Sequence, residues 1–433
     1  MIVLDIKDAR FWAKLEAACN QQTGTGAIAA QVTPVLEAVR QEGDRAVLRY
    51  TERFDGVKLT ARQLTVSANE LQAASQRVSP ALRRAVRESM RCVRDFHLKT
   101  RPRDWSGRNP QGGRVGERFY PLRRVGLYIP GGQVPLVSTV VMTVTLAKLA
   151  GCAEIAVATP PGPNGQISDG LMAALWMCGA REVYRMGGVQ ALAAMAYGTK
   201  TVAPVDKLFG PGAAHSIEAK RQLFGTVGVD LLPGPSEVMV IADGSARAEW
   251  VAADLLAQAE HGTGKEKVFL VATGKAFLAK VDRALETQLS SLRHAAKIRT
   301  VLENGYTTVR VGSVQQAAEV ANFVAPEHLE LHVSPASSKT LVKAITTAGS
   351  ILVGEGSPTV LGDFTAGPSH TLPTGRTGRF LSGLQLTDFM RRTSVIEYPK
   401  KALEAAAPIV RAFAEIEQLD AHGRSLELRL EKR

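Results

Sequence analysis

The chain has 433 residues, of which 45% are hydrophobic and 22% charged, and a formal net charge of +12. This length predicts two or three domains with enough apolar material for a sizeable core. No stretch reaches the roughly 20 uninterrupted apolar residues of a membrane span, and the first residues lack the basic and apolar regions of a signal peptide.

The cysteines and basic residues indicate the compartment and the kinds of binding partner. The four cysteines are scattered and form no Cys-x-x-Cys motif, which predicts reduced thiols in a cytoplasmic protein. Lys and Arg are spread along the chain, and their densest run, residues 99–108, is broken by Pro and Asp and lacks aromatic residues interleaved with the basic ones, since Trp105 is its single aromatic residue. We therefore expect a solvated surface that attracts anionic ligands, with no nucleic-acid and no membrane partner.

The first hundred residues show helical patterns. Apolar residues recur at helical spacing over residues 32–57. Ser67 and Glu70 form a Ser-x-x-Glu capping pattern, and Pro80 opens a further helix. We expect residues 1–27 to form an N-terminal helical arm.

From residue 124 onward, short apolar strands ending in glycine alternate with helical segments. Such alternation is typical of parallel sheets covered by helices on both faces. It predicts an α/β fold of two Rossmann-like parallel-sheet domains that lack the GxGxxG fingerprint, with small helical N-terminal and C-terminal extensions. After the arm, the expected units are a discontinuous first α/β domain (28–123 and 240–380), a second α/β domain (124–239) and a helical C-terminal tail domain (381–433).

Glycine-rich turns mark a candidate ligand cleft. Open parallel sheets bind ligands beyond the carboxyl ends of their strands. We expect those ends at "PGG" (130–132), "MGG" (186–188), "GPG" (210–212), "GPS" (234–236) and "GEGSP" (354–358). Any one such turn is more simply a strand–helix connection, but several together favour a cleft. No P-loop motif is present.

Histidine is scarce, with eight in the chain, and four of them lie near carboxylates or at a helix end. These four are His261, His328, His370 and His422. Each alone is better explained by a surface or hydrogen-bonded histidine. Together with carboxylates they have the composition of a zinc centre, although the spacing matches no diagnostic zinc motif.

The adjacent pair Glu327 and His328 follows Pro326. A neighbouring acid and imidazole can serve as separate proton-transfer groups for one substrate. The alternative is a helix start with a glutamate near its N-terminus.

Several longer motifs in a fixed order resemble the histidinol dehydrogenase family, whose members are zinc-dependent enzymes that end histidine biosynthesis. The resemblance covers nearly the whole chain. The motifs are "VRQEGDRAVLRYTERFDGV", "VGLYIPGGQVPLVSTVVM", "GGVQALAAMAYGT", "VDKLFGPG", "GPSEVMVIAD", "DLLAQAEHG", "APEHLEL", "GDFTAGPSHTLPTG" and "EQLDAH".

The resemblance implies one zinc ion per subunit and a homodimer with shared active sites. The implied zinc ligands are Gln258, His261, Asp363 and His422. The last of these lies in the C-terminal tail, which the resemblance implies reaches the partner subunit.

The resemblance also implies two successive NAD-dependent oxidations, from alcohol through aldehyde to carboxylate. His328 is the implied general base, and Glu327 the residue that activates water. The implied substrate contacts are Ser236, Gln258, His261, His328, Asp363, Glu417 and His422. The implied NAD contacts are Tyr128, Gln190 and the residue at position 213.

Position 213 departs from the family pattern. The family usually has Asn after "FGPG", whereas this chain has Ala213. Losing one such side-chain hydrogen bond typically costs about 0.5–1.5 kcal/mol. Ser369 also stands where Asn is frequent. An alternative reading is therefore a paralogue that oxidises another small polar primary alcohol, for example a sulfonated diol. Glu417 favours a cationic substrate instead.

Overall fold

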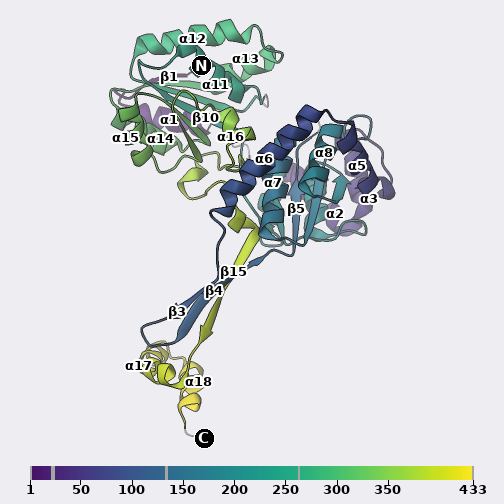
Figure 1. The fold of residues 1–433 in the computed structure, drawn as a ribbon, viewed down its shortest axis with the longest axis vertical. Coiled ribbons are helices and arrows are strands. Elements are labelled where there is room, and N and C mark those ends of the chain that lie inside the picture. Colours follow the sequence, from purple (N-terminus) through teal and green to yellow (C-terminus); the bar gives the residue numbers. More distant parts are fainter. Residues whose placement is uncertain (1, 21–24, 132–134, 262–263, 432–433) are drawn as a thin grey trace.

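The computed structural model describes residues 2–20, 25–131, 135–261 and 264–431, and it shows two sheet domains and an extended arm (Figure 1). No helix in these ranges is both long and apolar enough to cross a membrane. The predicted α/β class with two parallel-sheet domains is confirmed.

The first sheet has the strand order β2-β7-β6-β5-β8-β9. Its strands are β2 (Thr65–Val66), β5 (Arg124–Tyr128), β6 (Glu154–Thr159), β7 (Glu182–Arg185), β8 (Lys207–Phe209) and β9 (Gly228–Val229). The strand β2 is antiparallel to β7, and the other pairs are parallel. Without β2, the order follows the Rossmann pattern, with the first strand of the set in the middle.

Helices cover both faces of this sheet. They are α2 (Thr25–Glu42), α3 (Asp44–Asp55), α4 (Ala61–Leu64), α5 (Ala68–Arg77), α6 (Pro80–Leu98), α7 (Val137–Ala150), α8 (Asp169–Cys178), α9 (Gly188–Tyr197) and α10 (Ala214–Leu223). Val125 and Leu127 pack into one core and Tyr128 into the other. This follows from the two-residue period of a strand.

The second sheet has the order β1-β12-β11-β10-β13-β14, and all its pairs are parallel. Its strands are β1 (Ile2–Asp5), β10 (Glu237–Ala242), β11 (Lys267–Ala272), β12 (Tyr306–Arg310), β13 (His328–His332) and β14 (Ser350–Val353). Its helices are α1 (Phe11–Asn20), α11 (Ala248–Ala259), α12 (Lys275–Leu289), α13 (Ala295–Gly305), α14 (Val314–Val324), α15 (Pro335–Ala344) and α16 (Thr359–Phe364). Without β1, this sheet repeats the Rossmann order of the first.

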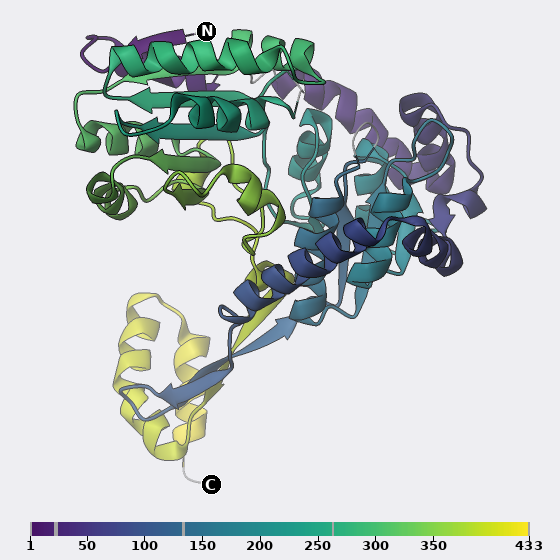
Figure 2. The ribbon, with the colours of Figure 1, turned by 45° about the horizontal axis from the view of Figure 1, so that its top comes forward.

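The arm is an antiparallel ribbon that carries two helices at its far end (Figure 1). It consists of β3 (Trp105–Arg108), β4 (Arg114–Pro121) and β15 (Met390–Glu397), followed by α17 (Lys400–Ile416) and α18 (Asp420–Leu430). Two short 3-10 helices, η1 (Thr377–Arg379) and η2 (Leu386–Phe389), lie on the path from the second sheet to β15. Figure 2 shows the tail helices set apart from both sheets.

The grouping of segments into domains differs from the sequence-based expectation. Residues 28–98 do not join 240–380, because α2 packs on α9 and α10, α6 packs on α7, and β2 pairs with β7. Within the predicted arm 1–27, strand β1 pairs with β12, so this segment extends the second sheet; residues 21–24 lie outside the described ranges. These pairings join segments far apart in sequence, which local patterns cannot reveal.

Candidate active site

Glu327 and His328 lie at the amino end of the central strands of the second sheet. His328 is the first residue of β13, which pairs in parallel with β10. Ser236 directly precedes β10. One expectation is therefore wrong, because "GPS" (234–236) comes before a strand and not after one. The alternative of a helix start at Glu327 is excluded, because His328 begins a strand. Residue 132 of the predicted turn 130–132 lies outside the described ranges.

The His328 ring is buried between two carboxyl groups. Its Nε2 lies 3.9 Å from Oε1 of Glu327 and 3.8 Å from Oδ1 of Asp363. Its Nδ1 lies 3.2 Å from Oγ of Ser350 at the start of β14. Burial, together with the nearby His370 and His261, lowers the pKa of His328 to about 3. The imidazole is therefore neutral at neutral pH and can accept a proton.

The Glu327 carboxyl is held by the neighbouring strand. Its Oε2 accepts a hydrogen bond of 2.8 Å from the backbone N–H of Glu237. Burial raises the pKa of Glu327 well above its usual value, and the charges of Glu237 and Asp363 add to that shift. A carboxylate in this setting binds a proton more readily than an exposed one, as a general base requires.

Gln258 and His261 lie at the C-terminal end of α11. The Gln258 side chain is buried, and its Nε2 has no hydrogen-bond partner within the described part of the chain. The His261 Nδ1 lies 3.1 Å from the carbonyl oxygen of Gln258. Because a carbonyl oxygen can only accept, Nδ1 carries the proton in this contact and Nε2 keeps its lone pair.

Asp363 lies in the last turn of α16, next to His370. Its backbone oxygen lies 3.0 Å from Nδ1 of His370, and burial raises the pKa of its carboxyl to about 6. The Nε2 of His370 lies 3.3 Å from Oγ1 of Thr139 in the first domain. Ser89 of α6 also donates to the backbone oxygen of Phe364. These contacts join the amino edge of the second sheet to the first domain.

The donor set fits a zinc ion. Gln258, His261 and Asp363 offer an amide oxygen, an imidazole nitrogen and a carboxylate oxygen, all of which bind zinc. The Gln258 side chain is buried and its amide nitrogen is unpaired among the residues that the structure describes. That nitrogen is a donor and calls for an acceptor, so zinc would be held by the amide oxygen.

The residues proposed for NAD gather at the carboxyl edge of the first sheet. Tyr128 ends β5, and its hydroxyl accepts a 3.2 Å hydrogen bond from the backbone N–H of Gly188. Gln190 follows in α9, is buried, and its Oε1 has no partner among the described residues. Ala213 follows β8 as the exposed N-cap residue of α10. A Cβ at Gly210 would lie 2.0 Å from the backbone carbonyl oxygen of Tyr128, so this turn requires glycine.

The tail residues lie far from this site within one chain. Glu417 caps the C-terminal end of α17, and His422 lies in the first turns of α18; both are exposed. Figure 1 shows α17 and α18 at the opposite end of the arm from α11 and α16. A single chain therefore brings together Gln258, His261, Asp363, Glu327 and His328, but not Glu417 and His422.

Sequence reasoning missed Glu237, Ser350 and Thr139, which hold Glu327, His328 and His370 in place. Single polar residues within apolar strands and helices carry no pattern. Their partners follow from strand order and domain packing, so no local signal could identify them. The sequence marks His370 as a candidate but indicates no role for it.

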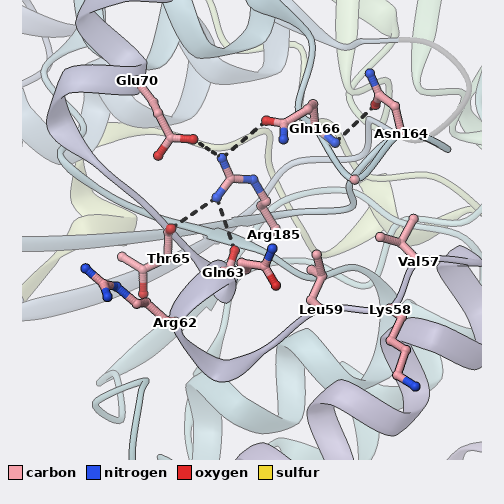
Figure 3. A pocket seen from close by; sticks show the side chains of 11 residues that line it. Val57, Lys58, Leu59, Arg62, Gln63, Thr65, Glu70, Asn164, Gln166 and Arg185 are labelled. Atoms are coloured by element: carbon pink, nitrogen blue, oxygen red, sulfur yellow. Dashed lines mark hydrogen bonds and ion pairs between the residues drawn. The ribbon is translucent and has the colours of Figure 1, made fainter.

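A separate pocket of about 470 Å³ lies in the first domain and contains none of the predicted site residues (Figure 3). Its centre is the buried guanidinium of Arg185, which donates to the backbone oxygens of Gln63 and Thr65 at 3.1 Å and pairs with Glu70. These bonds fix the edge strand β2 and the start of α5. Arg185 is therefore a structural residue.

Known proteins match the chain along its whole length. A family model described as histidinol dehydrogenase matches residues 19–430. A histidinol dehydrogenase from Aromatoleum aromaticum is 41% identical over 432 residues, covering 99% of this chain and 98% of the relative. One from Gluconobacter oxydans is 42% identical over 405 residues, covering 94% and 93%. The crystal structure of histidinol dehydrogenase from Elizabethkingia anophelis superposes with a TM-score of 0.94 at 33% identity, covering 99% and 98%.

Proposed function

Because the chain belongs to the histidinol dehydrogenase family, we propose that it oxidises L-histidinol to L-histidine through the aldehyde, in two NAD-dependent steps. The observation that carries the proposal is the buried His328 ring, with carboxyl oxygens of Glu327 and Asp363 within 4 Å of its Nε2. The alternative of a paralogue acting on another alcohol is not favoured, since relatives at about 40% identity are histidinol dehydrogenases.

One zinc ion per subunit is assigned to Gln258, His261 and Asp363, with His422 of a second subunit as the fourth ligand. When bound, zinc would hold the amino and imidazole nitrogens of the substrate and so orient its alcohol carbon. The oxygen and nitrogen donors of these side chains, and the Nδ1–H contact of His261 that leaves its Nε2 for a metal, support this assignment.

His328 is assigned the role of general base. Its Nε2 would take the proton of the alcohol oxygen while the carbon that bears this oxygen gives up a hydride to NAD, which yields the aldehyde, and the ring would then release the proton to solvent. Glu327 takes a proton from the water that adds to this aldehyde. In the second oxidation, His328 would take a proton from a hydroxyl of the hydrate while the hydrate carbon gives up its hydride to a second NAD. The His328 ring is neutral, so a nitrogen lone pair is available for each proton.

NAD is assigned to the carboxyl edge of the first sheet, at Tyr128, Gln190 and Ala213. This edge lies at the point where the strand order reverses, between β5 and β8, where open α/β sheets bind ligands. Ala213 supplies a backbone contact only. The unpaired Oε1 of Gln190 is an available acceptor.

The tail supports a homodimer in which each chain completes the site of the other. Helix α17 exposes three large apolar side chains at helical spacing: Ile409 at 46%, Phe413 at 59% and Ile416 at 80%. Such a row is costly in water and marks a protein contact. Glu417 and His422 lie next to this row and are assigned to the substrate and zinc of the second chain.

The test is NADH formation from purified, zinc-loaded protein given L-histidinol and NAD. We expect two NADH for each histidine formed, loss of turnover with a chelator and recovery with added zinc. Absence of turnover with histidinol, together with turnover of another small polar alcohol, would overturn the substrate assignment.

A further inference from the structure

A buried cluster of three charged side chains lies directly behind the proposed zinc site. The cluster, here called the acid–imidazole cluster, consists of Asp254 on α11 and Glu330 and His332 on β13. The His332 Nε2 lies 3.0 Å from Oε2 of Glu330 and 3.3 Å from Oδ2 of Asp254. The side chains of Glu330 and His332 are 0% and 1% exposed, so water does not solvate their charges.

Glu330 also holds the start of α16. Its Oε1 accepts hydrogen bonds of 2.6 Å from both the backbone N–H and the hydroxyl of Thr359, the first residue of that helix. One carboxylate thus binds β13 to α16 with one oxygen and reaches the imidazole with the other.

The helices and the strand that hold the cluster also carry residues of the proposed zinc site, four residues further along each helix and two residues away on the strand. Asp254 precedes Gln258 by four residues in α11, and Thr359 precedes Asp363 by four residues in α16. Residues four apart lie on one face of a helix, and residues two apart lie on one face of a strand. Glu330 follows His328 by two. The cluster therefore repeats the arrangement of the site one layer deeper.

We propose that Glu330 is a positioning residue: by binding Thr359 and the His332–Asp254 pair, it fixes α16 against β13 and α11, and so fixes Asp363 relative to His328 and Gln258. The inference rests on the proposed zinc site. Partners of metal-binding residues that lie outside the ligand shell orient the ligands, and changing them typically costs 10–100-fold in metal affinity or activity.

The same three side chains have the composition of a cation site, but the contacts favour positioning. One oxygen of Glu330 is already occupied by two donors from Thr359, and the other contacts His332 at an ordinary hydrogen-bond distance. Both oxygens of Glu330 therefore have protein partners, which favours positioning over a second metal.

The test compares zinc affinity in Glu330→Gln and Thr359→Val proteins, measured by competition with a chelator on the purified full-length chain. Thr201→Val is the matched control, because the backbone N–H and hydroxyl of Thr201 bind the carboxylate of Asp44 in the first domain in the same way. We expect about 10–100-fold weaker zinc binding in the two cluster variants. Zinc binding should be unchanged in Thr201→Val and largely restored in Thr359→Ser.

Three readouts separate the outcomes. Thermal melting of the metal-free proteins measures any general loss of stability, which is expected in Thr201→Val as well as in the cluster variants. Wild-type zinc affinity in both cluster variants, in protein that oxidises histidinol, would overturn the positioning role and leave the proposed function intact. A second bound metal per wild-type chain that disappears in Glu330→Gln would overturn it in favour of a cation site. Failure of the wild-type chain to bind zinc would instead contradict the proposed function.

Discussion

The two sheet domains share one strand order but present opposite edges to the proposed reaction. In each, the reversal of strand order lies between two central strands, β5 and β8 in the first and β10 and β13 in the second. The first domain offers Tyr128 and Ala213 at the carboxyl ends of its strands, whereas the second offers Ser236, Glu327 and His328 at the amino ends.

This difference has an electrostatic meaning. The carboxyl edge of the first sheet is lined by the N-terminal ends of α9 and α10, whose backbone N–H groups attract anions such as the phosphates of NAD. The amino edge of the second sheet meets the C-terminal end of α11, which attracts cations. The fold thus provides one edge suited to an anionic cofactor and another suited to a metal ion and a cationic substrate.

The largest expected effect is the loss of zinc binding at the amino edge of the second sheet, with the first sheet left intact. The substitution His261→Ala deletes an assigned zinc ligand, so it should abolish both zinc retention and histidinol turnover. NAD binding at the other domain should persist. Metal analysis and NAD titration of the same preparation check this. His294→Ala, at an exposed position in the second domain, is the control. A fully active metal-free His261→Ala protein would contradict the assignment.

The next largest effect is a loss of proton transfer without a loss of zinc or NAD binding. The substitution His328→Asn removes the assigned base, so kcat should fall by about 10²–10⁴-fold with zinc and NAD still bound. Steady-state kinetics at saturating zinc and NAD measure it. Retention of kcat within a few-fold would show that another group accepts the proton.

A smaller effect concerns a buried histidine in the first domain. Neither ring nitrogen of His97 has a partner in the described ranges, and burial lowers its pKa from 6.5 to about 4. The unfolded chain therefore binds this proton more readily. The stability present above pH 6.5 should fall by about 3 kcal/mol as the pH drops toward 4. Urea unfolding of wild-type and His97→Phe proteins across this range tests it, and an equal acid loss in both would contradict it.

The smallest effect concerns the cofactor edge. The substitution Ala213→Asn restores the side chain usual in the family, so NAD should bind more tightly by about 0.5–1.5 kcal/mol, roughly two- to twelve-fold in Kd. Zinc affinity should not change, because the proposed zinc site lies in the second domain and position 213 lies in the first. Titration of NAD into both proteins measures this, and Ala213→Ser provides a shorter side chain for comparison. Equal affinity in all three would show that position 213 makes no side-chain contact.

The fold class and the candidate residues could be predicted from the sequence, but their placement could not. Glycine-proline turns look alike whether they precede or follow a strand, so the sequence places "GPS" (234–236) after a strand although it precedes β10. In "HLELHV" the alternation of polar and apolar residues is typical of a half-exposed strand. In the structure, Leu329 and Leu331 pack into a core, and the polar face is buried as well, against α11 and α16. That burial depends on helices distant in sequence.

The ribbon of β4 and β15 has a consequence for how activity is distributed among molecules. It pairs eight residues of each strand and holds the tail far from the sheets of its own chain. In the proposed homodimer, each reaction centre is then assembled from two polypeptides, so specific activity should fall on dilution below the dimer dissociation constant. A chain lacking His328 and a chain lacking His422 are each inactive alone. Their mixed dimer places both defects in one centre and leaves the other whole, so random mixing restores about a quarter of the centres.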